Sequence, residues 1–214
     1  MYEEKQPSYF SNPREDIIQL LPEKIHRVLE VGCGSGATLS IIKSKFPDSI
    51  TVGIELSERA AEVASKRVDV VRNLDIERNE SRSTLGQFDL ILLLDVLEHL
   101  KDPWATLNCL VKDNLCARGT VITSIPNARN HSLVVQLLRG EFEYKESGVL
   151  DKTHLRFFTK KSMIRLIEEA GLKVVQCNPT NVEGNSRSAL LNRLTFGLME
   201  QFLAVQYITR AIKP

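Results

Sequence analysis

From residue 28 to residue 125 the chain alternates short apolar runs with longer segments in which apolar residues recur every three or four positions. The runs have the length of β-strands and the longer segments have the periodicity of amphipathic helices. Leu90–Leu94 is apolar throughout, as expected for a parallel strand that helices cover on both faces. The pattern predicts an α/β fold with right-handed crossovers. The expected elements are 28–31, 37–46, 50–55, 58–67, 69–74, 88–94, 103–115 and 119–125.

Two segments depart from this alternation. Residues 1–26 precede the first strand, and residues 128–158 interrupt the rhythm after the fifth. The length suits a single domain, 1–214, with an N-terminal cap segment (1–26) and an insertion (128–158). The remaining pattern predicts helices at 16–21, 132–139, 161–170 and 188–199, and strands at 172–177 and 202–212.

Alternating glycines join the first strand to the following helix. Glycine tolerates positive φ and lets a ligand approach the backbone, and the N–H groups at the helix start face such a ligand, so a nucleotide-like cofactor fits. Gly32, Gly34 and Ala37 match the G-x-G-x-x-A fingerprint of a dinucleotide site, in which the helix holds a pyrophosphate. Glu30 with Gly32, Gly34 and Gly36 gives a second spacing, E-x-G-x-G-x-G.

The second spacing resembles motif I of the class I S-adenosylmethionine-dependent methyltransferases. In that family the acidic residue, here Glu30, lies near the methionine ammonium group of the cofactor, and the Coulomb interaction favours this cation over a pyrophosphate. Glu55 ends the second strand, where an acidic residue accepts hydrogen bonds from ribose hydroxyls, and Asp75 matches the family's acidic residue near adenine. Residues 88–100 and 119–127 resemble the family's fourth and fifth strands. The resemblance implies S-adenosyl-L-methionine as the cofactor.

The resemblance also implies a complete fold and a set of cofactor-binding residues. The fold is a Rossmann-like seven-stranded sheet with helices on both faces, strand order 3-2-1-4-5-7-6, an antiparallel last strand and a small insertion after strand 5. Asp95 and Val96 would border the methionine end of the cofactor, and Cys33 would act through its backbone. The expected cofactor-binding residues are Glu30, Gly32, Cys33, Gly34, Gly36, Glu55, Leu56, Asp75, Ile76, Asp95 and Val96.

Residues 95–103 and 150–159 resemble methyltransferase domains of types 11, 12 and 23, which often accompany glycosyltransferases of bacterial surface-polysaccharide pathways, and the O-methyltransferases of ubiquinone synthesis. The expected acceptor is a hydroxyl of a small molecule or glycan precursor. Such an acceptor requires a base, and histidine titrates near neutral pH. His154 in the insertion is the candidate base, with Asp151 to orient it. The alternative is that His154 only caps or packs against the insertion.

Four further residues are candidates for the substrate end of the site. Tyr9 and Arg14 would help to close the pocket, His99 follows the fourth strand, and Arg156 would pair with a substrate phosphate or carboxylate. Each has a structural alternative: the N-terminal segment packs on the sheet edge, His99 holds its loop, and Arg156 pairs with an acidic neighbour.

Composition limits the partners that we expect. The 28 Lys and Arg residues are scattered and nearly balanced by 27 Asp and Glu, so no nucleic-acid partner is expected. The start does not resemble a signal peptide and no apolar run is long enough to cross a bilayer, which predicts a cytoplasmic protein without a membrane span. Four scattered cysteines and the lack of an H-x-x-x-H pair predict no metal site, with Glu98 and His99 near His154 the one place left open.

Two other functions remain open from the sequence. Because NAD and S-adenosylmethionine share a ribose, Glu55 also fits an NAD-dependent oxidoreductase. A non-catalytic module that keeps the cofactor pocket for a partner protein is the second alternative.

Overall fold

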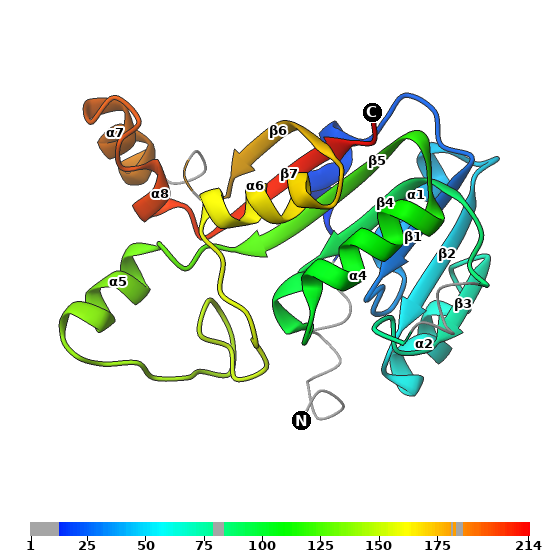
Figure 1. The fold of residues 1–214 in the computed structure, drawn as a ribbon, viewed down its shortest axis with the longest axis horizontal. Coiled ribbons are helices and arrows are strands. Elements are labelled where there is room, and N and C mark those ends of the chain that lie inside the picture. The colour runs from blue at the N-terminus through cyan, green and yellow to red at the C-terminus, as the bar shows by residue number, and fades with distance from the viewer. Residues whose placement is uncertain (1–12, 79–83, 181, 183–185) are drawn as a thin grey trace.

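The structure, a computed structural model, describes residues 13–78, 84–180, 182 and 186–214. Its strands form one seven-stranded sheet between two layers of helices (Figure 1). None of the helices in the described segments is long and apolar enough to cross a membrane. The strands are β1 (Arg27–Val31), β2 (Ile50–Glu55), β3 (Val70–Asn73), β4 (Phe88–Leu94), β5 (Leu115–Pro126), β6 (Lys173–Pro179) and β7 (Gln206–Ile212).

Among the described residues, an α-helix follows each of β1, β2 and β4 before the next strand begins. The α-helices are α1 (Ala37–Lys45), α2 (Glu58–Ala64), α4 (Pro103–Cys109), α5 (His131–Leu138), α6 (Lys160–Glu169), α7 (Ser186–Leu194) and α8 (Glu200–Leu203). Short 3₁₀ or π-helical segments are η2 (Glu15–Leu20), η3 (Leu97–His99) and η4 (Leu110–Asn114).

The strand order is β3-β2-β1-β4-β5-β7-β6, which confirms the predicted Rossmann-like sheet. β1 pairs in parallel with β2 and β4, and β7 runs antiparallel between β5 and β6. The carboxyl ends of the parallel strands therefore meet at one edge, where ligands bind in open α/β sheets. Because β7 is antiparallel, its first residues lie at that same edge.

Successive strand residues point to opposite sides of the sheet. Because the central strands are apolar throughout, both faces of the sheet are apolar. Leu29 belongs to a buried cluster with residues of α4 and α6, which lie in front of the sheet in Figure 1. Its neighbour Val28 belongs to a second cluster with residues of η2, α1 and α2. The core thus has two layers, and it fixes the loops at the carboxyl edge from both sides.

Several boundaries differ from those predicted for the middle of the chain. The helix expected at 58–67 ends at Ala64, and the one expected at 103–115 ends at Cys109 and continues as η4. β5 begins at Leu115 rather than at residue 119, because Leu115 pairs with Phe88 before a register shift in the ladder. The buried Asn114 amide donates to the carbonyl of Gly86 (2.9 Å), which holds this junction.

The C-terminal elements also differ from the prediction. The single helix expected at 188–199 is two helices, because Phe196 and Gly197 have positive φ values of 51° and 84° and turn the chain between them. The last strand begins at Gln206 instead of residue 202, since Phe202 and Leu203 belong to α8. The apolar character of 202–205 misled the sequence pattern, which cannot separate a short helix from a strand over four residues.

Residues 128–158 leave and rejoin the sheet at neighbouring points. The Ala128 N–H donates to the Phe158 carbonyl (2.7 Å), beside a parallel bridge between Asn127 and Phe158. α5 and the loop that follows it extend beyond the carboxyl end of β5 (Figure 1). Leu133 and Leu150 belong to a small buried cluster within this segment. The insertion is therefore anchored at its base and lies where a substrate would approach the sheet edge.

Candidate active site

Two adjoining cavities open at the carboxyl edge of the sheet. Their volumes are about 500 and about 330 Å³, and both are lined by Gly32, Asp95, Val96 and His99. Gly32 follows β1, and the other three follow β4. The glycine turn and the loop after β4 thus form the boundary between two halves of one site.

Gly32 has no room for a side chain. Its φ is 68°, and a Cβ there would lie 2.9 Å from Cγ2 of Val96. The N–H groups of Gly32 and Cys33 both donate to the Ile54 carbonyl (2.8 and 3.0 Å), and the Gly34 N–H donates to Oε2 of Glu55 (2.8 Å). Protein acceptors therefore use the N–H groups that a pyrophosphate would require.

Glu30 lines the larger cavity and has a buried, unsatisfied carboxylate oxygen. The residue is 4% exposed, and its Oε2 has no hydrogen-bond partner among the described residues. Burial raises the pKa of Glu30 to about 8, and the charge of Glu55 adds to this effect, whereas a hydrogen bond from Thr38 and the charge of Arg14 oppose it. A cationic ligand group beside Oε2 would offset the lost hydration.

The Glu55 carboxylate stabilises the glycine turn by accepting main-chain hydrogen bonds. It is 1% exposed, and its second oxygen, Oε1, accepts a hydrogen bond from the Ser57 N–H (2.9 Å). Each carboxylate oxygen keeps a further lone pair, so the expected bonds to ribose hydroxyls stay a prediction. Two carboxylates beside the turn make this place unfavourable for a pyrophosphate and favourable for a cation.

The smaller cavity is largely apolar. Leu56, Ile76 and Val96 line it together with Asp75, as the predicted adenosine end of the site requires. Oδ1 of Asp75 accepts a hydrogen bond from the Glu77 N–H (2.9 Å), which fixes the turn after β3. The structure thus brings together the residues predicted on three separate strand ends.

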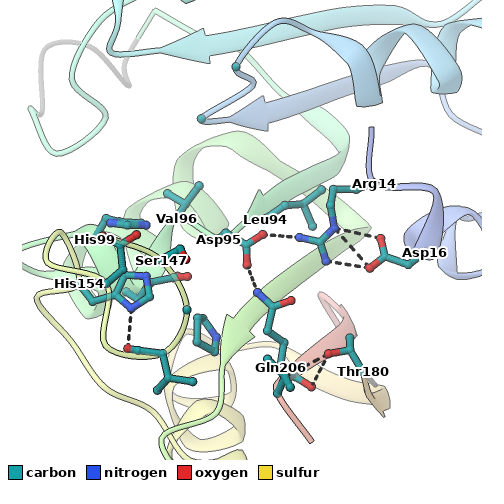
Figure 2. A pocket seen from close by; sticks show the side chains of 18 of the residues that line it. Arg14, Asp16, Leu94, Asp95, Val96, His99, Ser147, His154, Thr180 and Gln206 are labelled. Carbon is teal, nitrogen blue, oxygen red and sulfur yellow. Dashed lines mark hydrogen bonds and ion pairs between the residues drawn. The ribbon is translucent and has the colours of Figure 1, made fainter. Parts of the chain in front are cut away.

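Asp95 lies at the centre of a polar network in the larger cavity (Figure 2). It has a positive φ of 57°, and its carboxylate accepts hydrogen bonds from Arg14 and Gln206. Arg14 also pairs with Asp16 (2.9 Å). Burial raises the pKa of Asp95, and the charge of Arg14 opposes that rise. Arg14 therefore lines the larger cavity, and its role in closing the pocket stays a prediction, whereas Tyr9 lies outside the described residues.

Glu98, His99 and His154 form a second polar group in the same cavity. The two imidazole rings lie side by side in Figure 2, with centroids 4.7 Å apart and planes at 73°. The Glu98 carbonyl accepts hydrogen bonds from the N–H groups of Leu155 and Arg156 (2.8 and 2.9 Å). These two bonds tie the insertion to η3 and so place His154 beside the loop after β4.

The main chain orients the His154 ring. His154 is 8% exposed, and its Nδ1 lies 2.9 Å from the Val149 carbonyl oxygen. Asp151 was expected to orient the ring, but its Oδ1 accepts hydrogen bonds from the N–H and hydroxyl of Thr153 (2.9 and 2.7 Å). Asp151 also accepts a bond from the His154 N–H through its own carbonyl (2.9 Å). It therefore shapes the turn that carries His154, and Val149 supplies the bond to the ring.

A model of a family described as a methyltransferase domain matches residues 2–177, most of the chain. The chain belongs to this methyltransferase family. The ubiquinone biosynthesis O-methyltransferase of Dinoroseobacter shibae is 28% identical over 200 residues, which cover 90% of this chain and 75% of that protein. The trans-aconitate 2-methyltransferase of Deinococcus radiodurans is 26% identical over 141 residues, which cover 64% and 54%.

Solved methyltransferases share the fold. An S-adenosylmethionine-dependent methyltransferase from Archaeoglobus fulgidus superposes with a TM-score of 0.66 at 16% identity, covering 92% of this chain and 91% of that one. The N-methyltransferase NodS from Bradyrhizobium japonicum, solved with S-adenosylhomocysteine, has a TM-score of 0.58 at 19% identity, covering 89% and 79%. The family assignment overturns both the oxidoreductase and the non-catalytic alternative.

S-adenosylmethionine is the cofactor of this methyltransferase, and the residues present fit it. The orphaned oxygen of Glu30 suits an ammonium donor, and the absence of a side chain at Gly32 leaves the turn open between the two cavities. The apolar walls of the smaller cavity suit an adenine ring. When bound, the cofactor supplies a methyl group activated by a sulfonium.

The methyltransferase site contains residues that the sequence analysis missed. Gln206 and Thr180 line the larger cavity, with the Gln206 N–H 3.1 Å from Oγ1 of Thr180. Gln206 was missed because β7 was expected to start four residues earlier, so that its true first residue was not placed at the carboxyl edge. Thr180 was missed because β6 was expected to end at residue 177, whereas it ends at Pro179. Arg156, a predicted substrate residue, is exposed and donates to the Lys101 carbonyl.

Proposed function

We propose that this methyltransferase transfers a methyl group to a hydroxyl oxygen of a small molecule or glycan precursor, and that His154 removes the hydroxyl proton. The observation that carries the proposal is that His154 lines the same cavity as Glu30, the expected contact of the cofactor's methionine end. Several relatives are named ubiquinone biosynthesis O-methyltransferases, which supports an oxygen acceptor of phenolic type.

The residues at the cofactor end would hold and orient it. Glu30 would accept a hydrogen bond from the methionine ammonium group, and Leu56, Asp75 and Ile76 would enclose the adenosine end. Arg14, held by Asp95, offers a guanidinium to the cofactor's carboxylate. These contacts fix one reactant, and good alignment of two reactants contributes about 7–11 kcal/mol to a bimolecular step.

His154 is arranged to accept a proton at Nε2. A carbonyl oxygen can only accept a hydrogen bond, so the contact with Val149 requires a proton on Nδ1 and leaves the lone pair of the neutral ring on Nε2. The hydroxyl proton would move to that atom as the oxygen attacks the methyl carbon. Burial raises the pKa of the neighbouring Glu98 well above its usual range, and a positive charge beside it would oppose that rise.

The base is tested with His154→Ala and label transfer from methyl-labelled cofactor to a panel of phenols, polyprenyl phenols and nucleotide sugars. We expect kcat to fall by about 10²–10⁴ while S-adenosylhomocysteine still binds. His26→Ala, which removes an exposed histidine before β1, is the matched control and should retain the wild-type rate. A His154→Ala enzyme with an unchanged kcat would contradict the assignment.

Three expectations from the sequence stay predictions. They are the division of the single domain into a cap segment and an acceptor-site insertion, a cytoplasmic location, and an acceptor that is not a nucleic acid. The insertion does contribute Val149, Asp151 and His154 to the larger cavity, which supports its role at the acceptor end.

A further inference from the structure

Asp95 is a half-buried carboxylate in a strained backbone conformation. It directly follows β4 with a φ of 57°, and its N–H donates to the carbonyl of Ser124 (3.0 Å). A non-glycine residue adopts this left-handed conformation at a cost, so the surroundings must hold it in place. A carboxylate that is partly removed from water also requires hydrogen-bond donors. The position and direction of the Asp95 side chain therefore depend on the groups around it.

The two carboxylate oxygens of Asp95 have different partners. Oδ1 accepts hydrogen bonds from Nε2 of Gln206 and from the hydroxyl of Ser124 (3.2 Å). Oδ2 accepts a hydrogen bond from the guanidinium of Arg14, on the opposite side of the carboxylate from Gln206 (Figure 2). The terminal torsion of an aspartate has only broad preferences of its own. Two bonds on Oδ1 therefore fix the rotation of the carboxylate and direct Oδ2 to Arg14, so that Gln206 acts on Arg14 through Asp95.

The strand β7 fixes the direction of the Gln206 side chain independently of Asp95. The Gln206 N–H lies 3.1 Å from Oγ1 of Thr180, its carbonyl accepts a hydrogen bond from the Thr180 N–H (2.9 Å), and its register partner is Pro126. Successive strand residues point to opposite faces of a sheet. The next residue, Tyr207, is 1% exposed and belongs to the buried cluster on the side of α4 and α6. The Gln206 side chain therefore points the other way, where it lines the larger cavity.

The chemistry of an amide suits this link between β7 and the loop after β4. An amide donates through its NH₂ group without adding a charge, so no second cation competes with Arg14 for the Asp95 carboxylate. A hydrogen bond to a charged group is also stronger than one between neutral groups. Arg14 is further tied to Asp16 (2.9 Å) and to the hydroxyl of Ser124 (3.0 Å). Arg14 is thus held at the cavity by a closed network, in which Gln206 is the member that β7 supplies.

We propose that Gln206 is a positioning residue of the methyltransferase, which orients Asp95 so that Arg14 meets the carboxylate of the cofactor's methionine end. The proposal rests on the contact between Arg14 and the cofactor that is part of the proposed function. Gln206 itself needs to touch neither the cofactor nor the acceptor. Removal of its amide would free the Asp95 carboxylate to rotate. Arg14 would then lose the geometry in which a guanidinium meets a planar carboxylate with two parallel hydrogen bonds.

Calorimetric titration of the full chain with S-adenosylhomocysteine tests this role without an acceptor. Gln206→Leu removes the amide and should weaken binding by roughly 2–30-fold, the range expected for a member of a coupled network. In a chain that already carries Arg14→Ala, the same change should have little further effect, because Gln206 acts through Arg14. Gln176→Leu, at an exposed glutamine of β6, is the matched control and should bind like the wild type.

Gln206→Glu keeps the test valid if Gln206→Leu does not fold. At pH 5 the new carboxyl and Asp95 share a proton, which replaces the hydrogen bond of the amide, and affinity should be close to that of the wild type. At pH 8 the two carboxylates repel each other, and the ratio of wild-type to variant affinity should rise roughly tenfold or more. Arg14 and the other titratable groups of the cavity are common to both proteins, so the ratio isolates the new carboxyl. These other groups are the carboxyls of Asp16, Glu30, Glu98 and Asp151, the imidazoles of His99 and His154, and the thiol of Cys33.

Three results would overturn the role of Gln206. They are unchanged affinity in folded Gln206→Leu, losses that add up when Gln206→Leu is combined with Arg14→Ala, and a ratio for Gln206→Glu that does not change with pH. Additive losses are what a purely structural role of the strand start would give. The expected binding effects without label transfer to any hydroxyl would count against the proposed acceptor alone, whereas label transfer by the wild type with unchanged binding in Gln206→Leu would count against the positioning role alone.

Discussion

Glu30 illustrates how a single residue at the cofactor end lowers stability in favour of binding. Its pKa is raised to about 8 by burial, against an ordinary value of 4.5. Below pH 4.5 the carboxyl is protonated in both the folded and the unfolded chain and has no effect. Between pH 4.5 and 8 the folded state binds more protons than the unfolded state, so the free energy of unfolding falls as pH rises.

Glu30→Gln should therefore stabilise the ligand-free protein more at pH 8 than at pH 5. The wild type should lose up to about 1.4 kcal/mol per pH unit across this window relative to the variant. Urea denaturation of both proteins at pH 5, 6.5 and 8 measures the difference. Glu23→Gln, at an exposed glutamate near the end of the N-terminal segment, is the control and should show no such trend. A difference that does not grow with pH would contradict the burial of an ionising Glu30.

Residues with local signatures could be predicted from the sequence, and residues defined by contact could not. Glu30 lies near the end of β1, Gly32 and Asp95 directly follow strands, and all three belong to short motifs and line the cavities. Glu98 lies beside His154 only because two main-chain hydrogen bonds bring the insertion to η3. The bond from Val149 to the His154 ring likewise depends on a loop conformation that no spacing reveals.

At the scale of elements, Gly36 fixes how α1 packs against its neighbour. Gly36 is the N-cap of α1 with φ 75°, and a Cβ there would lie 2.6 Å from Cγ2 of Val68 and 3.4 Å from Ala64. Gly140, after α5, has nearly the same φ of 76°, but no atom lies within 4 Å of a Cβ placed there. An alanine would therefore have the same backbone strain at both positions, and only at Gly36 would its methyl group also collide with neighbouring atoms.

Gly140→Ala should cost about 1–2 kcal/mol of stability from the left-handed backbone alone. Gly36→Ala should cost that amount plus about 1–3 kcal/mol, because the added methyl group displaces Val68 or separates α1 from α2. Chemical denaturation of both variants at one pH gives the difference. Equal losses would show that Gly36 serves only backbone conformation and that the packing described here is wrong.

The elements that could be predicted are those whose pattern has one explanation. The uninterrupted apolar strands β1, β2 and β4 were placed within one residue, because buried parallel strands leave few alternatives. The region from residue 186 to β7 was misplaced, since residues 202–205, where α8 ends and β7 is about to begin, form a short apolar run. The positive φ values of Phe196 and Gly197 separate α7 from α8, and the pairing of Gln206 with Pro126 sets the start of β7.

For the whole molecule, the sheet order brings distant segments to one edge. Arg14, Glu30, Asp95, His154 and Gln206 line a single cavity although they span most of the chain. The strand order was predictable from resemblance to the family, and the two-layered core follows from the apolar pattern. The cavity itself depends on how the insertion returns to the sheet at Phe158 and on where the antiparallel β7 begins.

The central claim is that the glycine turn and Glu30 bind the zwitterionic, sulfur-bearing end of the cofactor. Calorimetric titration of the wild type and Glu30→Gln with S-adenosylhomocysteine and with NADH tests it most directly. We predict one S-adenosylhomocysteine site per wild-type chain, affinity reduced roughly tenfold or more in Glu30→Gln through loss of a charge-assisted hydrogen bond, and no binding of NADH. Equal affinity of the two proteins for S-adenosylhomocysteine, or binding of NADH in its place, would contradict the account.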